Sequence, residues 1–136
     1  MTNEEVWQAL NTELTTDSLS RGYSGMTDEQ VMVDINTVYR TQIKDFLTGD
    51  EIFTSTDETE FTGLSDANKT LWVSFTSKDS IDPGNSANVA FVNYVFGGGS
   101  TTLSNLSTLR LENVSRGQEL FGRDIVVGDV QHARRL

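Results

Sequence analysis

The side chains that carry most enzyme chemistry are scarce in this chain. Its 136 residues include no cysteine and a single histidine, His132. The lack of cysteine excludes disulfides, thiolate nucleophiles and cysteine-bound metals. A catalytic histidine needs an orienting acid and a nucleophile, and nothing in the sequence pairs with His132. We therefore expect His132 to be a surface residue and the protein not to be an enzyme.

Two further stretches have residue types that bind ions or nucleotides. Acidic residues gather at 50–51 and 57–60, but they lack the alternating oxygen ligands and central glycine of a calcium loop. The run G-G-G-S-T-T at 97–102 precedes a predicted helix, where free N–H groups favour anions. It lacks the G-K-[ST] element of a nucleotide-binding loop. We therefore expect the acidic residues to lie in a solvated loop and the glycine-rich run to be a breaker between two packed helices. We expect the protein to bind neither a metal nor a cofactor.

Charge limits the partners. The formal net charge is −10, which disfavours binding to nucleic-acid phosphates. Residues 1–99 carry 16 acidic and 5 basic side chains, whereas residues 100–136 carry 4 acidic and 5 basic ones. This polarity could steer docking between copies or onto a partner of opposite charge. The alternative is an acidic surface that only keeps the protein in solution.

The chain shows no sign of membrane insertion or nucleic-acid stacking. Residues 1–5 have neither the basic nor the apolar part of a signal peptide, and no apolar run approaches the roughly 20 residues of a membrane span. Trp7 and Trp72 have no interleaved lysine or arginine, so we expect both in the core. The sequence thus predicts a soluble protein.

The elements that position these side chains are clearest at residues 21–39. Arg21 to Gly25 indicates a tight turn, in which Gly22 and Gly25 can take positive φ. Thr27 is the predicted N-cap of a helix, because Gln30 stands at the capping-box position. One apolar stripe at helical spacing follows, made of Val31, Ile35, Val38 and Tyr39.

Three further cap signals predict helices. Thr2 with Glu5 precedes an apolar face of Val6, Trp7, Leu10 and Leu14, which extends to about residue 15. A third T-x-x-E box at 48–51 predicts a short helix. Ser65 or Asp66 caps another, with Leu71, Trp72 and Phe75 inward, although V-S-F-T-S at 73–77 also resembles a strand.

Some segments have ambiguous patterns. Residues 41–47 have helical spacing but a threonine content that disfavours a helix. Residues 54–62 resemble a polar loop with Phe61 inserted into the core. Pro83-Gly84 indicates a turn. The apolar stretch 86–96 suits a buried strand or a buried helix, and its helical neighbours favour a helix.

The C-terminal third supplies the last helices. Ser100 caps a helix whose face comprises Leu103, Leu106, Leu111 and Val114, and helical structure continues to a stop at Gly122. A short extended piece at 125–127 leads to Asp129, the expected cap of a last turn at 130–135. The predicted fold is mainly α, a single small domain over 1–136 with about six or seven short helices and room for a minor strand pair.

Two blocks of sequence carry a resemblance. The first is R-G-Y-S-G-M-T-D at 21–28, and the second comprises V-S-R at 114–116, E-L at 119–120, V-G-D-V at 127–130 and A-R at 133–134. Together with F-G-G-G-S-T-T at 96–102, they resemble in order and spacing a family of small proteins encoded in tailed-bacteriophage genomes. The middle, roughly 40–90, departs from the family in detail.

The resemblance implies a structural protein of a tailed-phage particle that acts through protein–protein contacts. A head-to-tail connector, that is a neck or adaptor component, is the first expectation, and a capsid decoration (cement) protein is the alternative. A non-virion phage ligand-binding protein or enzyme is a further alternative. The expected partners are portal, neck or capsid subunits and copies of the chain itself, in a virion assembled from protein made in the bacterial host cytoplasm.

Arginine marks the expected interface. The C-terminal third is arginine-rich on an otherwise acidic chain, and arginine pairs with carboxylates bidentately at interfaces. The candidate interface residues are Arg110, Arg116, Arg123, Arg134, Arg135 and Leu136. The alternative is that Val130 and Leu136 close the core of the same chain.

Overall fold

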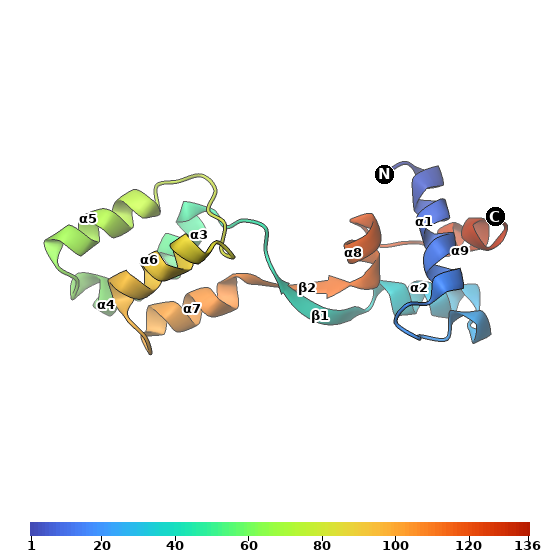
Figure 1. Cartoon of the computed structure of the whole chain (residues 1–136), viewed down its shortest axis with the longest axis horizontal. Coiled ribbons are helices and arrows are strands. Elements are labelled where there is room, and N and C mark those ends of the chain that lie inside the picture. The colour runs from blue at the N-terminus through green and yellow to red at the C-terminus, as the bar shows by residue number, and fades with distance from the viewer. The chain divides into compact units, whose positions relative to one another are not determined.

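The computed structural model describes residues 1–136 and has a mainly α fold. It contains nine α-helices, one 3-10 helix and one two-stranded antiparallel sheet (Figure 1). The mainly α prediction is confirmed, and the strand pair is present. The helices outnumber the predicted six or seven because several are single short turns with caps of their own.

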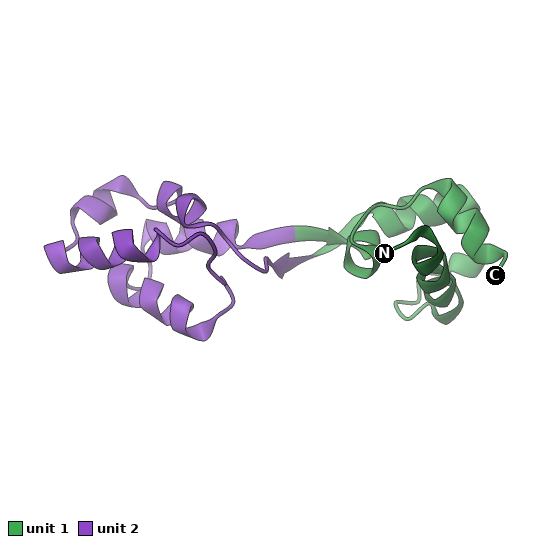
Figure 2. Cartoon of the chain, turned by 90° about the horizontal axis from the view of Figure 1, so that it is seen from above, with its two compact units in different colours: residues 1–40, 113–136 green, residues 41–112 purple.

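The chain forms two compact units, coloured separately in Figure 2. Unit 1 comprises residues 1–40 and 113–136, and unit 2 comprises residues 41–112. The division falls within both strands of the sheet, β1 (Val38–Ile43) and β2 (Leu111–Ser115). The single domain over 1–136 stays a prediction, and each unit is described by itself below.

Unit 1 combines the two ends of the chain. Its helical elements are α1 (Asn3–Thr16), the 3-10 helix η1 (Tyr23–Gly25), α2 (Asp28–Asn36), α8 (Arg116–Phe121) and α9 (Val127–Arg134). The capping boxes predicted at Thr2 and Thr27 are both confirmed: each hydroxyl accepts from the backbone N–H three residues on, at 3.2 Å. Gly22 takes φ +78° before η1, whereas Gly25 does not have positive φ.

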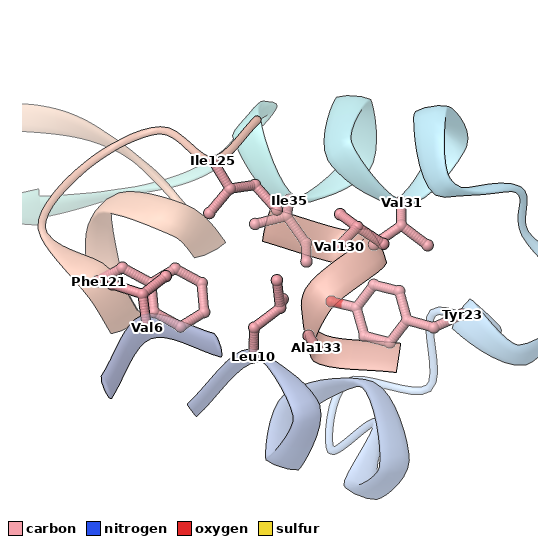
Figure 3. Packing of buried hydrophobic residues seen from close by; sticks show 9 residues of the cluster. All are labelled: Val6, Leu10, Tyr23, Val31, Ile35, Phe121, Ile125, Val130 and Ala133. Atoms are coloured by element: carbon pink, nitrogen blue, oxygen red, sulfur yellow. The ribbon is translucent and has the colours of Figure 1, made fainter. Parts of the chain in front are cut away.

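The core of unit 1 is built from both ends. Figure 3 shows nine buried side chains that converge between α1, α2 and the C-terminal segment. The N-terminal part contributes Val6, Leu10, Tyr23, Val31 and Ile35, and the C-terminal part contributes Phe121, Ile125, Val130 and Ala133. Val130 therefore closes the core of its own chain, as one sequence alternative held, whereas Leu136 is exposed.

Two local predictions in unit 1 are wrong. Helix α2 ends at Asn36, because Thr37 is extended (φ −79°, ψ 130°), so Val38 and Tyr39 lie in β1 and are exposed. The side chain of Asn36 pairs with both backbone groups of Ile125 (2.8 and 2.9 Å), which fixes this helix end. Asp129 is not an N-cap: α9 begins earlier, and the Asp129 carboxylate accepts from Val126 N–H at 3.0 Å.

Unit 2 is one continuous stretch of chain. Its helices are α3 (Gly49–Thr54), α4 (Glu58–Thr62), α5 (Asp66–Phe75), α6 (Ser86–Phe96) and α7 (Thr101–Leu109). The caps predicted at Thr48, Ser65 and Ser100 are confirmed by side-chain acceptors for the N–H three residues on. Residues 86–96 are a helix, as predicted.

Aromatic rings organise the core of unit 2. The buried set is Leu47, Ile52, Trp72, Phe75, Ile81 and Val95. The Trp72 ring is fully buried, lies 4.8 Å from Phe96 in an edge-on contact, and donates from Nε1 to Thr56 Oγ1 at 3.0 Å. Leu47 and Ile81 exchange backbone hydrogen bonds of 2.8 Å, which join the segments before α3 and after α5.

Three predictions in unit 2 are corrected. The expected loop 54–62 contains α4, with Phe61 packed against the core. Leu71 faces outward rather than inward. Helix α7 ends at Leu109, and Leu111 and Val114 belong to β2, because the chain after Arg110 pairs with β1 instead of extending the helix.

Candidate interaction surfaces

Arg116, at the start of α8, forms the most buried ion pair. Its Nε donates to Glu13 Oε2 at 2.9 Å and its Nη2 to Glu13 Oε1 at 2.8 Å. The Tyr23 hydroxyl also donates to Glu13 Oε2, at 2.9 Å. Glu13 is 5 % exposed. Arg116 thus neutralises a buried carboxylate of α1 and ties the two ends of the chain together.

Glu119 extends this network along α8. It accepts hydrogen bonds from Tyr39, Arg40 and Arg116, with Tyr39 Oη at 2.8 Å from Oε2. Burial acts to raise the pKa of Glu119, but these three donors outweigh it, so the pKa lies below its ordinary value. The carboxylate therefore stays ionised and holds the unit 1 end of β1 to α8.

Arg123 and Asp129 form a second cluster. Asp129 accepts from Trp7 Nε1 at 2.9 Å, from Val126 N–H at 3.0 Å and from Arg123 Nη1 at 3.2 Å. Burial acts to raise the pKa of Asp129, but these donors together lower it below its ordinary value. The His132 ring stacks on Trp7 at 4.0 Å between centroids. His132 is exposed on its other side, as expected for a surface residue.

Arg134 secures the turn before α2. Its Nη1 donates to Asp28 at 2.6 Å, and its Nη2 donates to the backbone carbonyls of Tyr23 and Met26, both at 2.9 Å. The guanidinium therefore joins two carbonyls of the η1 turn to the carboxylate of the first residue of α2. Arg134 belongs to one resemblance block and its partners to the other.

The six candidate interface residues therefore divide into two groups. Arg116, Arg123 and Arg134 are engaged within unit 1. Arg135 and Leu136 are exposed, with Leu136 at 66 %. Arg110, in unit 2, makes no side-chain hydrogen bond or ion pair, and its Nε is buried. Their role as an interface stays a prediction, and the last three are the ones open to a partner.

The resemblance blocks meet in space. Residues 21–28, 114–116, 119–120, 127–130 and 133–134 all lie in unit 1. The contacts just described, Glu13 with Arg116 and Arg134 with Asp28, connect the N-terminal part to the C-terminal one. Unit 2 contains the third stretch of the resemblance, residues 96–102, and almost all of the stretch at roughly 40–90 that does not share it.

A carboxylate of the protein itself binds the backbone N–H groups that follow the glycine-rich run, at the start of α7. Glu60 of α4 accepts from Thr101 N–H (2.8 Å), Thr102 N–H (2.7 Å) and Thr102 Oγ1 (2.7 Å). The Thr102 hydroxyl and then the backbone donors lower the pKa of Glu60. The sequence predicted a breaker here and gave no signal for this pairing, because Glu60 lies 41 residues upstream of Thr101 and nothing local marks it. No group of three or more acidic or histidine side chains is placed to hold a metal ion.

Unit 2 exposes several large apolar side chains. They are Ile43, Phe46, Phe53, Leu71, Val73, Tyr94 and Leu111. Tyr94 and Phe46 are the most open, at 71 % and 57 %. The bond from Lys44 N–H to Arg110 carbonyl (2.8 Å) sets the strand pairing so that Ile43 stands opposite Leu111. Ile43 and Leu111 are thus exposed apolar neighbours, and contiguous exposed apolar residues are typical of protein interaction surfaces.

Comparisons with protein-family models, with curated proteins and with solved structures found no match. No helix combines the length and the apolar character that crossing a membrane requires.

Proposed function

We propose that this chain is a structural protein of a tailed-phage particle that works through protein–protein contacts, as a component of the head-to-tail connector. The observation that carries the proposal is the meeting of the two resemblance blocks in unit 1. Their residues contribute to one core and to two ion-pair clusters, so the two blocks belong to one folded unit, while the third stretch, residues 96–102, lies in unit 2.

The contact surfaces are proposed to lie on unit 2 and at the end of α9. Unit 2 carries exposed large apolar side chains, among them Ile43 opposite Leu111 on the sheet. Arg135 and Leu136 are open to a partner at the chain terminus. Apolar anchors beside arginine are the composition favoured at the centres of protein interfaces.

A peptide-level inventory of purified particles tests this function. Particles of the phage that encodes the chain should contain it in the small, fixed copy number of a closed ring. A copy number comparable with that of the major capsid protein would instead favour the decoration alternative. Absence from particles, with the protein present in infected cells, would contradict both and favour a non-virion ligand-binding protein or enzyme.

A further inference from the structure

Unit 2 contains a pocket that its fold does not fill. The pocket has a volume of about 270 Å³ and lies among α3, α5, α6 and α7. Its wall is mainly apolar, formed by Ile52, Phe75, Val89, Val92 and Leu106. For scale, an apolar cavity of about 150 Å³ holds a benzene molecule. The pocket therefore accepts an apolar group larger than one aromatic ring.

One cation lines this apolar pocket. Arg110 follows α7, and its backbone is held by hydrogen bonds to Leu106 (3.1 Å) and from Lys44 (2.8 Å). Its side chain makes no ion pair, and its Nε is buried without an acceptor. A buried guanidinium N–H without an acceptor is unfavourable. It is the only buried side-chain polar atom of the chain in this condition.

We propose that this pocket binds a small amphiphilic carboxylate, such as a medium-chain fatty acid, with its apolar body against the pocket wall and its carboxylate on Arg110. The Nη groups of Arg110 donate no hydrogen bond within the chain either, so they are the donors that a carboxylate in the pocket would meet. Guanidinium–carboxylate bonds are among the strongest hydrogen bonds in proteins. Ser107, one helical turn before Arg110 on α7, lines the same pocket and is exposed. A serine hydroxyl at this position can serve as a second donor to the carboxylate.

The charge of the ligand follows from the lining. An amine would meet Arg110 as a like charge, and an alcohol would leave the guanidinium without a counter-charge. Unit 2 as a whole carries 10 acidic and 4 basic side chains, but exposed charges beyond about 8 Å are largely screened at physiological salt. The local Arg110 therefore determines the selectivity. This site is independent of the proposed assembly function.

Calorimetric titration of the full chain with octanoate tests the proposal, with octan-1-ol and octylamine as probes of equal chain length. We expect octanoate to bind and to shift the amide NMR signals of Val92, Leu106 and Arg110. Octan-1-ol should bind at least about tenfold more weakly, and octylamine more weakly still. The variant Arg110→Gln should weaken octanoate binding about tenfold or more and leave octan-1-ol unchanged.

Two control variants separate charge from shape. Arg135→Gln removes the same charge from an exposed arginine outside the pocket and should leave octanoate binding unchanged. Ser107→Phe places a ring at the mouth and should weaken octanoate and octan-1-ol together. Absence of octanoate binding at millimolar concentration would overturn the proposal. Equal binding of octanoate and octan-1-ol, or equal binding to Arg110→Gln, would overturn it as well.

Discussion

At the scale of single residues, Glu13 is the most buried carboxylate in unit 1 and depends most on its partners. Taking a carboxylate out of water is unfavourable unless it is paired and hydrogen-bonded. Arg116 approaches it with two hydrogen bonds, and Tyr23 adds a third. The three side chains come from α1, η1 and α8, so one ionic cluster fixes the relative positions of three elements.

Removing Arg116 should therefore be costly. Arg116→Met keeps an apolar stem of similar length but leaves Glu13 without its counter-charge, and should lower the free energy of unfolding by about 3 kcal/mol. Urea unfolding at pH 7 measures the change. The control variant Arg135→Met changes an exposed arginine, and its free energy of unfolding should stay within about 0.5 kcal/mol of that of the unaltered chain. Adding Glu13→Gln to Arg116→Met should recover part of the lost stability. Equal losses for Arg116→Met and Arg135→Met would contradict the role of Arg116 as the counter-charge of Glu13.

Tyr23 makes the stability of unit 1 sensitive to alkaline pH. Burial, followed by the hydrogen bond to Glu13 and its charge, raises the Tyr23 pKa well above its ordinary value. A raised folded-state pKa gives stability that is complete below the unfolded pKa, about 10, and is lost as the pH rises above it.

The variant Tyr23→Phe isolates this effect. It should cost about 1 kcal/mol at pH 8, where only the hydrogen bond is lost. Above pH 10 the free energy of unfolding of the unaltered chain should fall by up to about 1.4 kcal/mol per pH unit relative to that of the variant. The free energies of unfolding of the two proteins therefore converge as the pH rises. Urea unfolding between pH 8 and pH 11 measures the difference. A difference that does not change with pH would show that Tyr23 titrates at its ordinary pKa.

Sequence reasoning could not assign these residue roles. The arginines were recognised as carboxylate partners, but their carboxylates, Glu13 and Asp28, lie 103 and 106 residues away. Type and spacing along the chain contain no signal for such pairs. The single histidine and the unpaired Arg110 likewise acquire their surroundings only in the folded chain.

At the scale of elements, local signals were sufficient for helix starts. Each cap that was predicted from a Thr or Ser and the residue three positions on is present, because a cap depends only on neighbouring atoms. The positions of the two strands were not predicted, because strand pairing depends on residues far apart in the sequence. Val38 and Tyr39 continue the helical spacing of Val31 and Ile35, and only pairing with β2, about 70 residues later, makes them extended.

The start of α3 is held by a close backbone approach. Gly49 N–H donates to the Lys78 carbonyl at 3.0 Å, and a Cβ on Gly49 would lie 1.9 Å from the Thr76 carbonyl oxygen. The neighbouring atoms are backbone, so they cannot rotate away. This contact requires glycine although φ at Gly49 is not positive.

Gly49→Ala should therefore displace α3 from the segment after α5. We expect it to lower the free energy of unfolding by about 2 kcal/mol or more, as overpacking does. Thermal unfolding followed by circular dichroism measures the loss. Gly98→Ala is the matched control, because a Cβ there meets nothing within 4 Å, and its effect should stay within about 0.5 kcal/mol. Equal effects of the two variants would show that α3 has room to move.

At the scale of the whole molecule, folding redistributes charge that looked uneven along the sequence. The arginine-rich end joins the acidic N-terminal part in unit 1, which holds 10 acidic and 6 basic side chains, a net charge of −4. Unit 2 holds 10 acidic and 4 basic side chains, a net charge of −6. The uneven charge along the sequence, which suggested steered docking, is therefore largely neutralised by ion pairs within unit 1.

The two units differ in how the chain builds them. Unit 1 needs both chain ends, because α8, α9 and the segment between them supply Phe121, Ile125, Val130 and Ala133 to its core. Unit 2 is a single stretch with its own aromatic core. Its first and last residues are joined by the strand pairing, with Gln42 Nε2 donating to Glu112 at 2.7 Å and Lys44 N–H to the Arg110 carbonyl.

We therefore expect a fragment of residues 41–112 to fold by itself, whereas a fragment of residues 1–40 should not. The 41–112 fragment should unfold cooperatively and give amide NMR signals that match the full chain for residues 45–109. A core of this size supplies only about 3–5 kcal/mol, and Trp72→Ala removes about that much, so the same fragment with Trp72→Ala should be unfolded. A disordered spectrum for the unaltered 41–112 fragment would mean that unit 2 depends on the rest of the chain. A folded Trp72→Ala fragment would mean that its core does not centre on that ring.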